Sequence, residues 1–114
     1  MNEFRYNLPY QELVGGAIAI SKQHFIQVNG FSNNFFGWGG EDDEFYQRLA
    51  KHHLHPLRLP PHQSNYVSLK HLKQSPTYSF LSHTSHTEDG LDTLEYQILS
   101  IKYLPMYTLV KVSL

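Results

Sequence analysis

Apolar residues along the chain gather into short stretches with different periods. Residues 14–20 form a continuous run of apolar and small side chains, which predicts a core strand buried on both faces. Ser21 then predicts the N-cap of a short helix, to which Phe25 and Val28 supply an apolar stripe. Asn29-Gly30 predicts the end of that helix, because these residue types tolerate the left-handed conformation on which helices commonly end.

A second helix is predicted from Glu41 to about Ala50. Acidic residues occupy its first turn, and Phe45 and Leu49 lie four residues apart on one side. The preceding residues, 31–40, are crowded with Gly, Asn and aromatic side chains and predict a loop.

The remaining stretches before the C-terminal part are less regular. Residues 1–13 predict an irregular segment, and weak alternation over 55–59 and 66–69 predicts short strands around the Pro60-Pro61 turn. Residues 74–89 are rich in Ser, Thr and His without a period, which predicts a long loop.

The C-terminal part predicts a β-hairpin. Leu94, Tyr96 and Ile98 alternate with polar residues, and the run 108–112 is rich in β-branched side chains. We expect two strands here, joined near Leu104-Pro105.

Composition narrows the possible functions. At 114 residues, the chain is long enough for a single domain with a core, residues 1–114. A formal charge of −1 and the lack of a Lys or Arg run argue against binding to nucleic acid or to a membrane surface. No stretch is apolar enough to span a membrane. The absence of cysteine excludes disulfides and thiolate metal sites.

The segment with the clearest chemistry joins a glycine-rich loop to three consecutive acids. It reads Gly37-Trp38-Gly39-Gly40 followed by Glu41-Asp42-Asp43. Glycines let the backbone approach a ligand closely, and a Trp between them presents a flat ring to a sugar. The acids also have a plain structural explanation, because a helix N-terminus favours negative charge by about 0.3–1 kcal/mol each. The segment therefore indicates either a carbohydrate site or a solvated acidic first turn.

An ordered set of motifs resembles the β-1,4-galactosyltransferases over nearly the whole chain. The set comprises Val14-Gly15-Gly16, Ser21-Lys22-Gln23-His24-Phe25, Asn29-Gly30-Phe31-Ser32-Asn33, the segment 37–43, Arg48-Leu49, Lys70-His71 and Asp89-Gly90-Leu91, with Leu94 and Tyr96 after it. Glu44-Phe45-Tyr46, Tyr66 and Ser68 resemble the xylosylprotein branch, whereas Gly40 resembles the branch that acts on N-acetylglucosamine. The resemblance implies an α/β fold of the GT-A glycosyltransferase type, represented by its C-terminal part, with a mixed sheet, short helices and a C-terminal β-hairpin.

The resemblance also implies a reaction, the inverting transfer of galactose from UDP-galactose to the 4-hydroxyl of an acceptor glycan or glycoprotein. The expected acceptor sugar is xylose of the proteoglycan linkage region, and the alternative is N-acetylglucosamine. Asp42 matches the catalytic base that takes the proton of the acceptor hydroxyl. Glu41 and Asp43 match positions that hydrogen-bond donor and acceptor hydroxyls.

A moving loop and a metal ion are further implications of the resemblance. Trp38 matches a loop Trp that moves over the sugar, with Gly39 and Gly40 as the hinge and the point of close approach. His71 matches a metal-binding histidine, and Mn²⁺ suits imidazole combined with carboxylate and diphosphate oxygen ligands. No second metal site is expected from the other histidines singled out, which are His52, His53, His55, His83 and His86.

Part of the family pattern is not found. Family members carry an N-terminal nucleotide-binding half with an Asp-x-Asp motif, and this sequence contains no Asp-x-Asp. We therefore expect a C-terminal portion with little or no transferase activity by itself. The family also implies a type II membrane protein of the Golgi lumen. Two other readings stay open: a sugar-binding module or inactive remnant, and a plain structural α/β domain.

Overall fold

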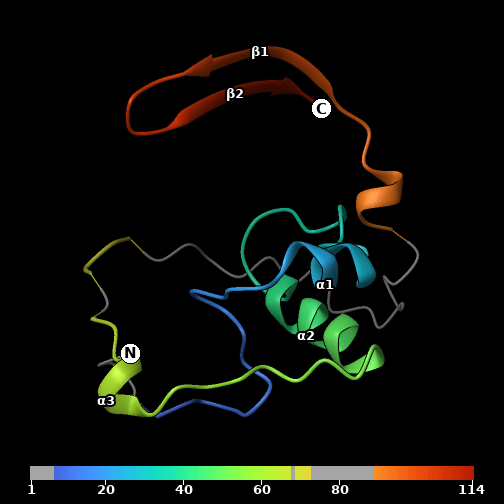
Figure 1. Ribbon diagram of the computed structural model, residues 1–114. Coiled ribbons are helices and arrows are strands. Elements are labelled where there is room, and N and C mark those ends of the chain that lie inside the picture. The colour runs from blue at the N-terminus through green and yellow to red at the C-terminus, as the bar shows by residue number, and fades with distance from the viewer. Residues whose placement is uncertain (1–6, 68, 73–88) are drawn as a thin grey trace.

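The computed structural model describes residues 7–67, 69–72 and 89–114, which Figure 1 draws in colour. The elements are α1 (Lys22–Gln27), α2 (Glu41–Lys51), α3 (Pro61–Ser64), a 3-10 turn (Leu91–Thr93), β1 (Gln97–Tyr103) and β2 (Thr108–Ser113). Helices α1 and α2 lie beside one another in the body of the molecule, and the β1–β2 hairpin stands apart from them (Figure 1). None of the described helices combines the length and apolar character needed to cross a membrane.

Helix α1 begins and ends as the sequence predicts. The Ser21 hydroxyl accepts a hydrogen bond from the His24 N–H at 3.1 Å, which satisfies one of the free amides of the first turn. At the other end, Asn29 and Gly30 both adopt left-handed backbone, with φ of 62° and 66°. The Gly30 N–H then donates to the Phe25 carbonyl at 2.9 Å, which closes the helix with a hydrogen bond found in many helix ends.

Helix α2 also matches its prediction closely. It starts at Glu41, directly after Gly40 in left-handed backbone, and runs to Lys51. His53 takes the left-handed conformation with φ of 57°. The Leu54 N–H donates to the Leu49 carbonyl at 2.9 Å, so α2 ends in the same kind of cap as α1.

The core is small and lies between α1 and α2. Its buried hydrophobic residues are Val14, Val28, Phe45 and Leu49. Phe45 is 1% exposed and stacks on Phe31 with ring centroids 4.1 Å apart. Phe25 packs against Phe45 at 6.1 Å in a tilted arrangement, a favoured geometry for aromatic pairs.

The predicted core strand over residues 14–20 is wrong. Val14 is buried and Ile20 half-buried, but the residues between them are exposed and form no strand. A buried strand needs hydrogen-bonded neighbours on both sides, and the sheet formed by the described residues consists of β1 and β2 alone. The predicted mixed sheet is therefore also absent from the described part of the chain, where the pairing is antiparallel.

The short strands predicted around Pro60-Pro61 are not found either. Residues 55–60 are irregular, and Pro61 begins the short helix α3, because its fixed φ and missing N–H suit a first helical position. The Arg58 guanidinium donates to the Gln11 and Leu13 carbonyls at 2.9 and 2.7 Å and ties this segment to the start of the described chain. Residues 7–13 are irregular, as predicted, while 1–6, Ser68 and most of the predicted loop 74–89 lie outside the described residues.

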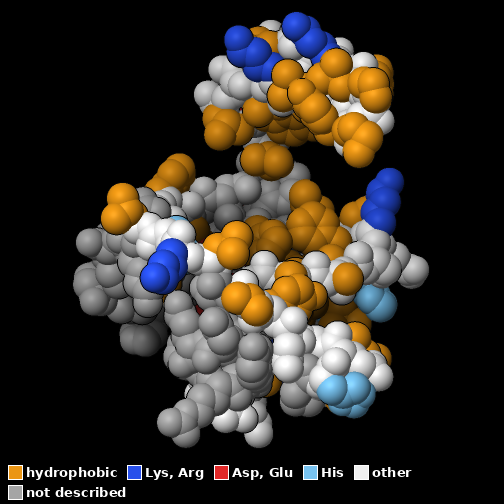
Figure 2. Space-filling view, turned by 90° about the vertical axis from the view of Figure 1, so that its left-hand side faces the viewer, with side chains coloured by type: hydrophobic (Ala, Val, Ile, Leu, Met, Phe, Trp, Pro, Cys, Tyr) orange, Lys and Arg blue, Asp and Glu red, His pale blue; other side chains and the backbone are white. Residues whose placement is uncertain are grey.

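The predicted C-terminal hairpin is confirmed, although β1 begins at Gln97, so that Leu94 and Tyr96 lie before the strand. Strands β1 and β2 are antiparallel, with Ile101 paired to Val110 and a register irregularity between Ile98 and Ser100. The Leu104 N–H donates to the Tyr107 carbonyl at 2.9 Å and closes the turn. The hairpin residues are exposed apart from half-buried Ser100, and Figure 2 shows hydrophobic side chains gathered over the hairpin.

Candidate active site

The acidic residues of the predicted sugar site lie together in the first turn of α2. Glu41 is exposed, Asp42 and Asp43 are half-buried, and Glu44 is buried. The free backbone N–H groups of a helix N-terminus stabilise negative charge, which offsets part of the repulsion between neighbouring carboxylates. The first turn therefore does not present its acids uniformly to solvent, because burial increases along it.

The environment of the acidic turn raises the pKa of Asp42. Burial raises the pKa of its carboxyl, and the charges of Asp43 and Glu41 raise it further, while hydrogen bonds from the backbone N–H groups of Asp42 and Asp43 act in the opposite direction. The Asp42 Oδ2 atom lies directly against Gly15, where an added Cβ would overlap it. A carboxylate with a raised pKa, held against bare backbone, has the character of a proton acceptor.

Asp43 is held by a partner that the sequence did not predict. The Tyr10 hydroxyl donates to the Asp43 Oδ1 at 2.8 Å. Burial, this hydrogen bond and the charges of Asp43, Asp42 and Glu12 raise the pKa of Tyr10 to about 12. Tyr10 therefore stays a neutral donor at physiological pH, and it joins the N-terminal segment to the acidic turn. No sequence signal in the irregular segment around Tyr10 pointed to this contact.

The glycine-rich residues form a loop, Phe35–Gly40, which we call the Trp38 loop. Gly37, Gly39 and Gly40 all have positive φ, of 94°, 108° and 90°, so the loop depends on glycine at these positions. The Gly39 N–H donates to the Glu41 carboxylate at 3.2 Å. The Trp38 side chain is 55% exposed beside the acidic turn that follows it.

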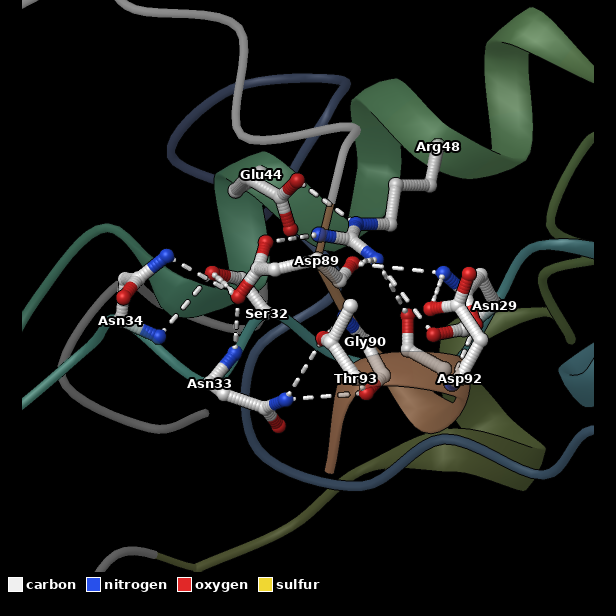
Figure 3. Close-up of polar contacts among 11 residues, drawn as sticks. Asn29, Ser32, Asn33, Asn34, Glu44, Arg48, Asp89, Gly90, Asp92 and Thr93 are labelled. Atoms are coloured by element: carbon white, nitrogen blue, oxygen red, sulfur yellow. Dashed lines mark hydrogen bonds and ion pairs between the residues drawn. The ribbon is translucent and has the colours of Figure 1, made fainter. Parts of the chain in front are cut away.

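Behind the acidic turn lies a polar network centred on Arg48 and Asp89 (Figure 3). Arg48 is 2% exposed; its Nε donates to the Glu44 carboxylate at 2.6 Å and its Nη2 to the Asp89 Oδ1 at 3.1 Å. Burial alone would raise the pKa of Asp89, but hydrogen bonds from the Asn33 N–H, the Ser32 hydroxyl and Arg48, together with the Arg48 charge, lower it instead. Asp89 is therefore ionised throughout the neutral range.

His71, the predicted metal ligand, is exposed, and its Nδ1 lies 2.9 Å from the Leu69 carbonyl oxygen. Within the described ranges, no three His, Asp or Glu side chains come close enough together to hold a metal ion. The described part of the chain thus offers His71 as a single candidate ligand and not a complete metal site.

The structure brings together six of the seven predicted site residues at the junction of the Trp38 loop and α2. These are Trp38, Gly39, Gly40, Glu41, Asp42 and Asp43. It adds Tyr10, Gly15 and the Arg48–Asp89 pair, whose positions depend on contacts between distant segments. Arg48 follows Glu44 by one helical turn, and this opposite-charge spacing was the signal available in the sequence for that half of the network.

Comparison with known proteins identifies the class. A family described as the N-terminal domain of galactosyltransferase matches residues 1–72, and the chain belongs to this galactosyltransferase family. Over 122 residues and the whole chain, it is 37% identical to beta-1,4-galactosyltransferase 1 of Bos taurus and 36% identical to the Homo sapiens protein of that name. It is 36% identical to beta-1,4-galactosyltransferase 3 of Bos taurus over 95% of the chain. The chain spans 29% to 31% of the length of these relatives.

Proposed function

We propose that the chain carries the acceptor-activating part of an inverting β-1,4-galactosyltransferase that uses UDP-galactose. The observation that supports this most directly is Asp42, half-buried with a raised pKa at the start of α2, directly after the glycine-rich loop that carries Trp38. Membership of the galactosyltransferase family supplies the reaction, and the acidic turn supplies a group with suitable chemistry for one of its steps.

In this mechanism, Asp42 is the general base. Its ionised carboxylate takes the proton of the acceptor 4-hydroxyl as that oxygen forms a bond to the anomeric carbon of galactose. The bond from the anomeric carbon to the UDP oxygen breaks, and its electron pair leaves with UDP. Attack from the face opposite UDP inverts the configuration. The raised pKa makes Asp42 a stronger base than an ordinary aspartate, so it accepts the proton more readily.

Glu41, Asp43 and Trp38 are proposed to hold the sugars. A carboxylate accepts hydrogen bonds from sugar hydroxyls, and the indole offers an apolar face to the ring. Gly39 and Gly40 leave space for a ligand close to the backbone and allow the loop to change shape. Closure of the loop over the sugars excludes water from the site, which favours transfer over hydrolysis of the donor.

A divalent metal such as Mn²⁺, if bound, would stabilise negative charge on the departing diphosphate. His71 is proposed as the one ligand that the described residues supply, and no step of the mechanism above passes through the metal. Titration of the chain with Mn²⁺, followed by electron paramagnetic resonance of the free ion, tests this assignment. Equal binding by the native chain and a His71→Ala variant would remove His71 from the metal site.

The decisive experiment for the base is Asp42→Asn in the full-length enzyme. Asparagine keeps the size of the side chain but cannot accept the proton, so turnover is expected to fall by on the order of 10²–10⁴ while donor affinity is nearly retained. Initial rates with UDP-galactose and calorimetric titration of the donor measure the two quantities. Unchanged turnover would remove the role assigned to Asp42.

A matched control for this experiment is Glu95→Gln, because Glu95 is an exposed acid between the 3-10 turn and β1, outside the acidic turn of α2. Its turnover is expected to equal that of the native enzyme. A sugar-binding module without activity is the competing function, and Trp38 presented beside acids would serve it equally well. Acceptor binding without any transfer by the full-length protein would favour that reading.

The acceptor sugar and the setting of the whole protein are part of the same proposal. Acceptor assays with a xyloside and with N-acetylglucosamine distinguish the xylosylprotein branch from the alternative, since each branch is expected to use one of the two. The whole protein is proposed to act on glycans or glycoproteins in the Golgi lumen as a type II membrane protein. Localisation of the tagged full-length protein tests this placement.

A further inference from the structure

The Asp89 carboxylate accepts hydrogen bonds from residues 32–34, which lead into the Trp38 loop. Its Oδ2 accepts from the Asn33 N–H at 2.5 Å, the Ser32 hydroxyl at 2.9 Å and the Asn34 amide at 3.1 Å. These donors precede Asp89 by 55 to 57 residues, so the contacts are long-range. The residues immediately before Phe35 are therefore held by a single carboxylate from a distant part of the chain.

The second Asp89 oxygen holds α2, the element on the other side of the Trp38 loop. Asp89 Oδ1 accepts from Arg48 Nη2 at 3.1 Å, and the Asp89 carbonyl accepts from Arg48 Nη1 at 2.6 Å. Arg48 also donates to Glu44 in the first half of α2, so the guanidinium is fixed on both sides. Figure 3 shows Arg48 reaching from α2 to Asp89, with Ser32, Asn33 and Asn34 on the opposite side of that carboxylate.

Close packing around the neighbouring glycine leaves Asp89 little freedom. Gly90 has φ of 151°, and a Cβ there would overlap the Asn29 carbonyl oxygen and lie 2.9 Å from Arg48 Nη1. The Asn33 amide donates to the Gly90 carbonyl at 2.9 Å, and the Gly90 N–H donates to the Thr93 hydroxyl at 2.9 Å. Asp89 is thus supported on its C-terminal side by the 3-10 turn.

These contacts hold the two ends of the Trp38 loop at a fixed separation. One end follows Asn34 and the other precedes Glu41, whereas three of the six residues between them are glycines with positive φ. The Phe35 ring lies close to Gly40, because a Cβ added to Gly40 would be 3.1 Å from the ring. Glycine-rich backbone between fixed ends can change its shape without moving its anchor points.

We propose that Asp89 is a positioning residue, which sets the place of the Trp38 loop relative to Asp42 by joining residues 32–34 to Arg48 on α2. The proposal rests on the proposed function only in naming this loop and turn as the sugar site. Asp89 itself touches no reacting atom in this scheme. Removing its charge is expected to leave α2 formed and to release the loop.

The test uses Asp89→Asn, whose amide would replace one accepting oxygen with a donor facing other donors. Trp38 is the one Trp in the sequence, so its fluorescence reports on the loop directly. The Trp38 side chain is 55% exposed in the structure. Loss of the Asp89 contacts is expected to expose it further and to raise acrylamide quenching by up to about twofold. Circular dichroism of the same sample measures whether helices are retained.

The matched control is Glu95→Gln. Glu95 is an exposed acid between the 3-10 turn and β1, and it takes no part in the Arg48–Asp89 network of the described residues. Its quenching is expected to equal that of the native chain. Asp89→Glu, which restores the charge, is expected to recover part of the protection. Native quenching in Asp89→Asn with helices retained would overturn the proposal.

A milder variant covers the case in which Asp89→Asn fails to fold. Ser32→Ala removes one donor to Asp89 and leaves the ion pair with Arg48 intact. An intermediate rise in quenching supports the proposal, and a quenching constant equal to that of the native chain counts against it. The fluorescence result is independent of catalysis. Absence of transferase activity in the native enzyme would contradict the proposed function, whereas the quenching of Trp38 fluorescence would still test whether Asp89 positions the loop.

In the active full-length enzyme, the positioning role has a kinetic signature. Asp89→Asn is expected to lower kcat because the loop is no longer aligned with Asp42, while the acid limb of the pH profile keeps its position because Asp42 itself is unchanged. A loss of activity explained only by less folded protein would lower the apparent kcat without changing quenching per folded molecule, and that pattern would contradict the proposal.

Discussion

The pKa of the Asp42 carboxyl is set by influences that act in opposite directions. The helix N-terminus stabilises the carboxylate, while burial and the adjacent acids raise its pKa, and the raising influences are larger. A carboxyl whose pKa is raised in the folded state binds its proton more tightly there, so its contribution to stability declines as pH rises through that range. At neutral pH, Asp42→Asn is therefore expected to unfold at no lower temperature than the native chain.

The charge of Asp43 is predicted to set part of the pH dependence of the enzyme. The base must be ionised, so activity falls as pH drops through the pKa of Asp42. Asp43→Asn removes one of the charges that raise this pKa, and the acid limb of kcat/KM is expected to move to lower pH. Burial is the largest cause and is retained, so the shift is partial. An acid limb that stays in place in Asp43→Asn, with Glu95→Gln as the control, would show that Asp43 does not act on the base.

Gly15 and Gly16 offer a matched pair with opposite expected defects. An alanine at Gly15 would push its Cβ into the Asp42 carboxylate, so turnover is expected to fall by about 10–100-fold with little loss of stability. Gly16 has open space around it but φ of 98°, so Gly16→Ala is expected to cost roughly 1 kcal/mol of stability while leaving Asp42 in place. Initial rates and denaturant unfolding separate the two. Equal effects in both assays would contradict this account.

At the scale of elements, the helices follow signals that lie within a few residues of each other. Ser21 caps α1 through the amide of His24, and Asn29-Gly30 ends it, because capping depends on local backbone geometry. The first residue of α2 also coincides with its prediction at Glu41. The strand prediction for residues 14–20 is wrong for the converse reason, since a strand depends on partners elsewhere in the chain.

The end of α2 gives a prediction about stability. His53 occupies a left-handed position that glycine adopts without steric cost, so His53→Gly is expected to raise the free energy of unfolding by about 0.5–1 kcal/mol. Urea unfolding monitored by circular dichroism measures the change. His55→Gly is the control, because His55 lies outside the left-handed region and gains nothing from glycine. A destabilised His53→Gly variant would show that the His53 side chain contributes more than the backbone strain costs.

At the scale of the whole molecule, the chain is more extended than a compact domain of its length. Its radius of gyration is 16.4 Å, whereas a compact chain of 114 residues has about 13 Å. Figure 1 shows one reason, since the β1–β2 hairpin projects away from the body that holds α1 and α2. Hydrophobic side chains on the hairpin, among them Tyr103 at 81% and Leu109 at 48% exposed, therefore add little to the core.

This arrangement predicts two levels of protection from hydrogen exchange. Helix α2 buries its own Phe45 and Leu49 in the core, which protects its amides, while the amides of β1 and β2 depend on a two-stranded pair that is marginal by itself. The hairpin is expected to exchange on the order of tenfold or more faster than α2. Leu49→Ala is expected to speed exchange in α2 and leave the hairpin unchanged. Common exchange rates for both parts would show that they unfold as one unit.

The sequence by itself determined the boundaries of α1 and α2, the C-terminal hairpin and the junction of the Trp38 loop with the acidic turn. Each depends on residues close together in the chain, where propensity, capping and glycine conformation decide the outcome. Only the tertiary structure placed Tyr10 on Asp43 and Gly15 against Asp42, and only it joined residues 32–34 to Arg48 through Asp89. Those contacts join residues that lie 27 to 57 positions apart in the sequence. No local pattern contains them, because burial and charge pairing exist only after the chain has folded.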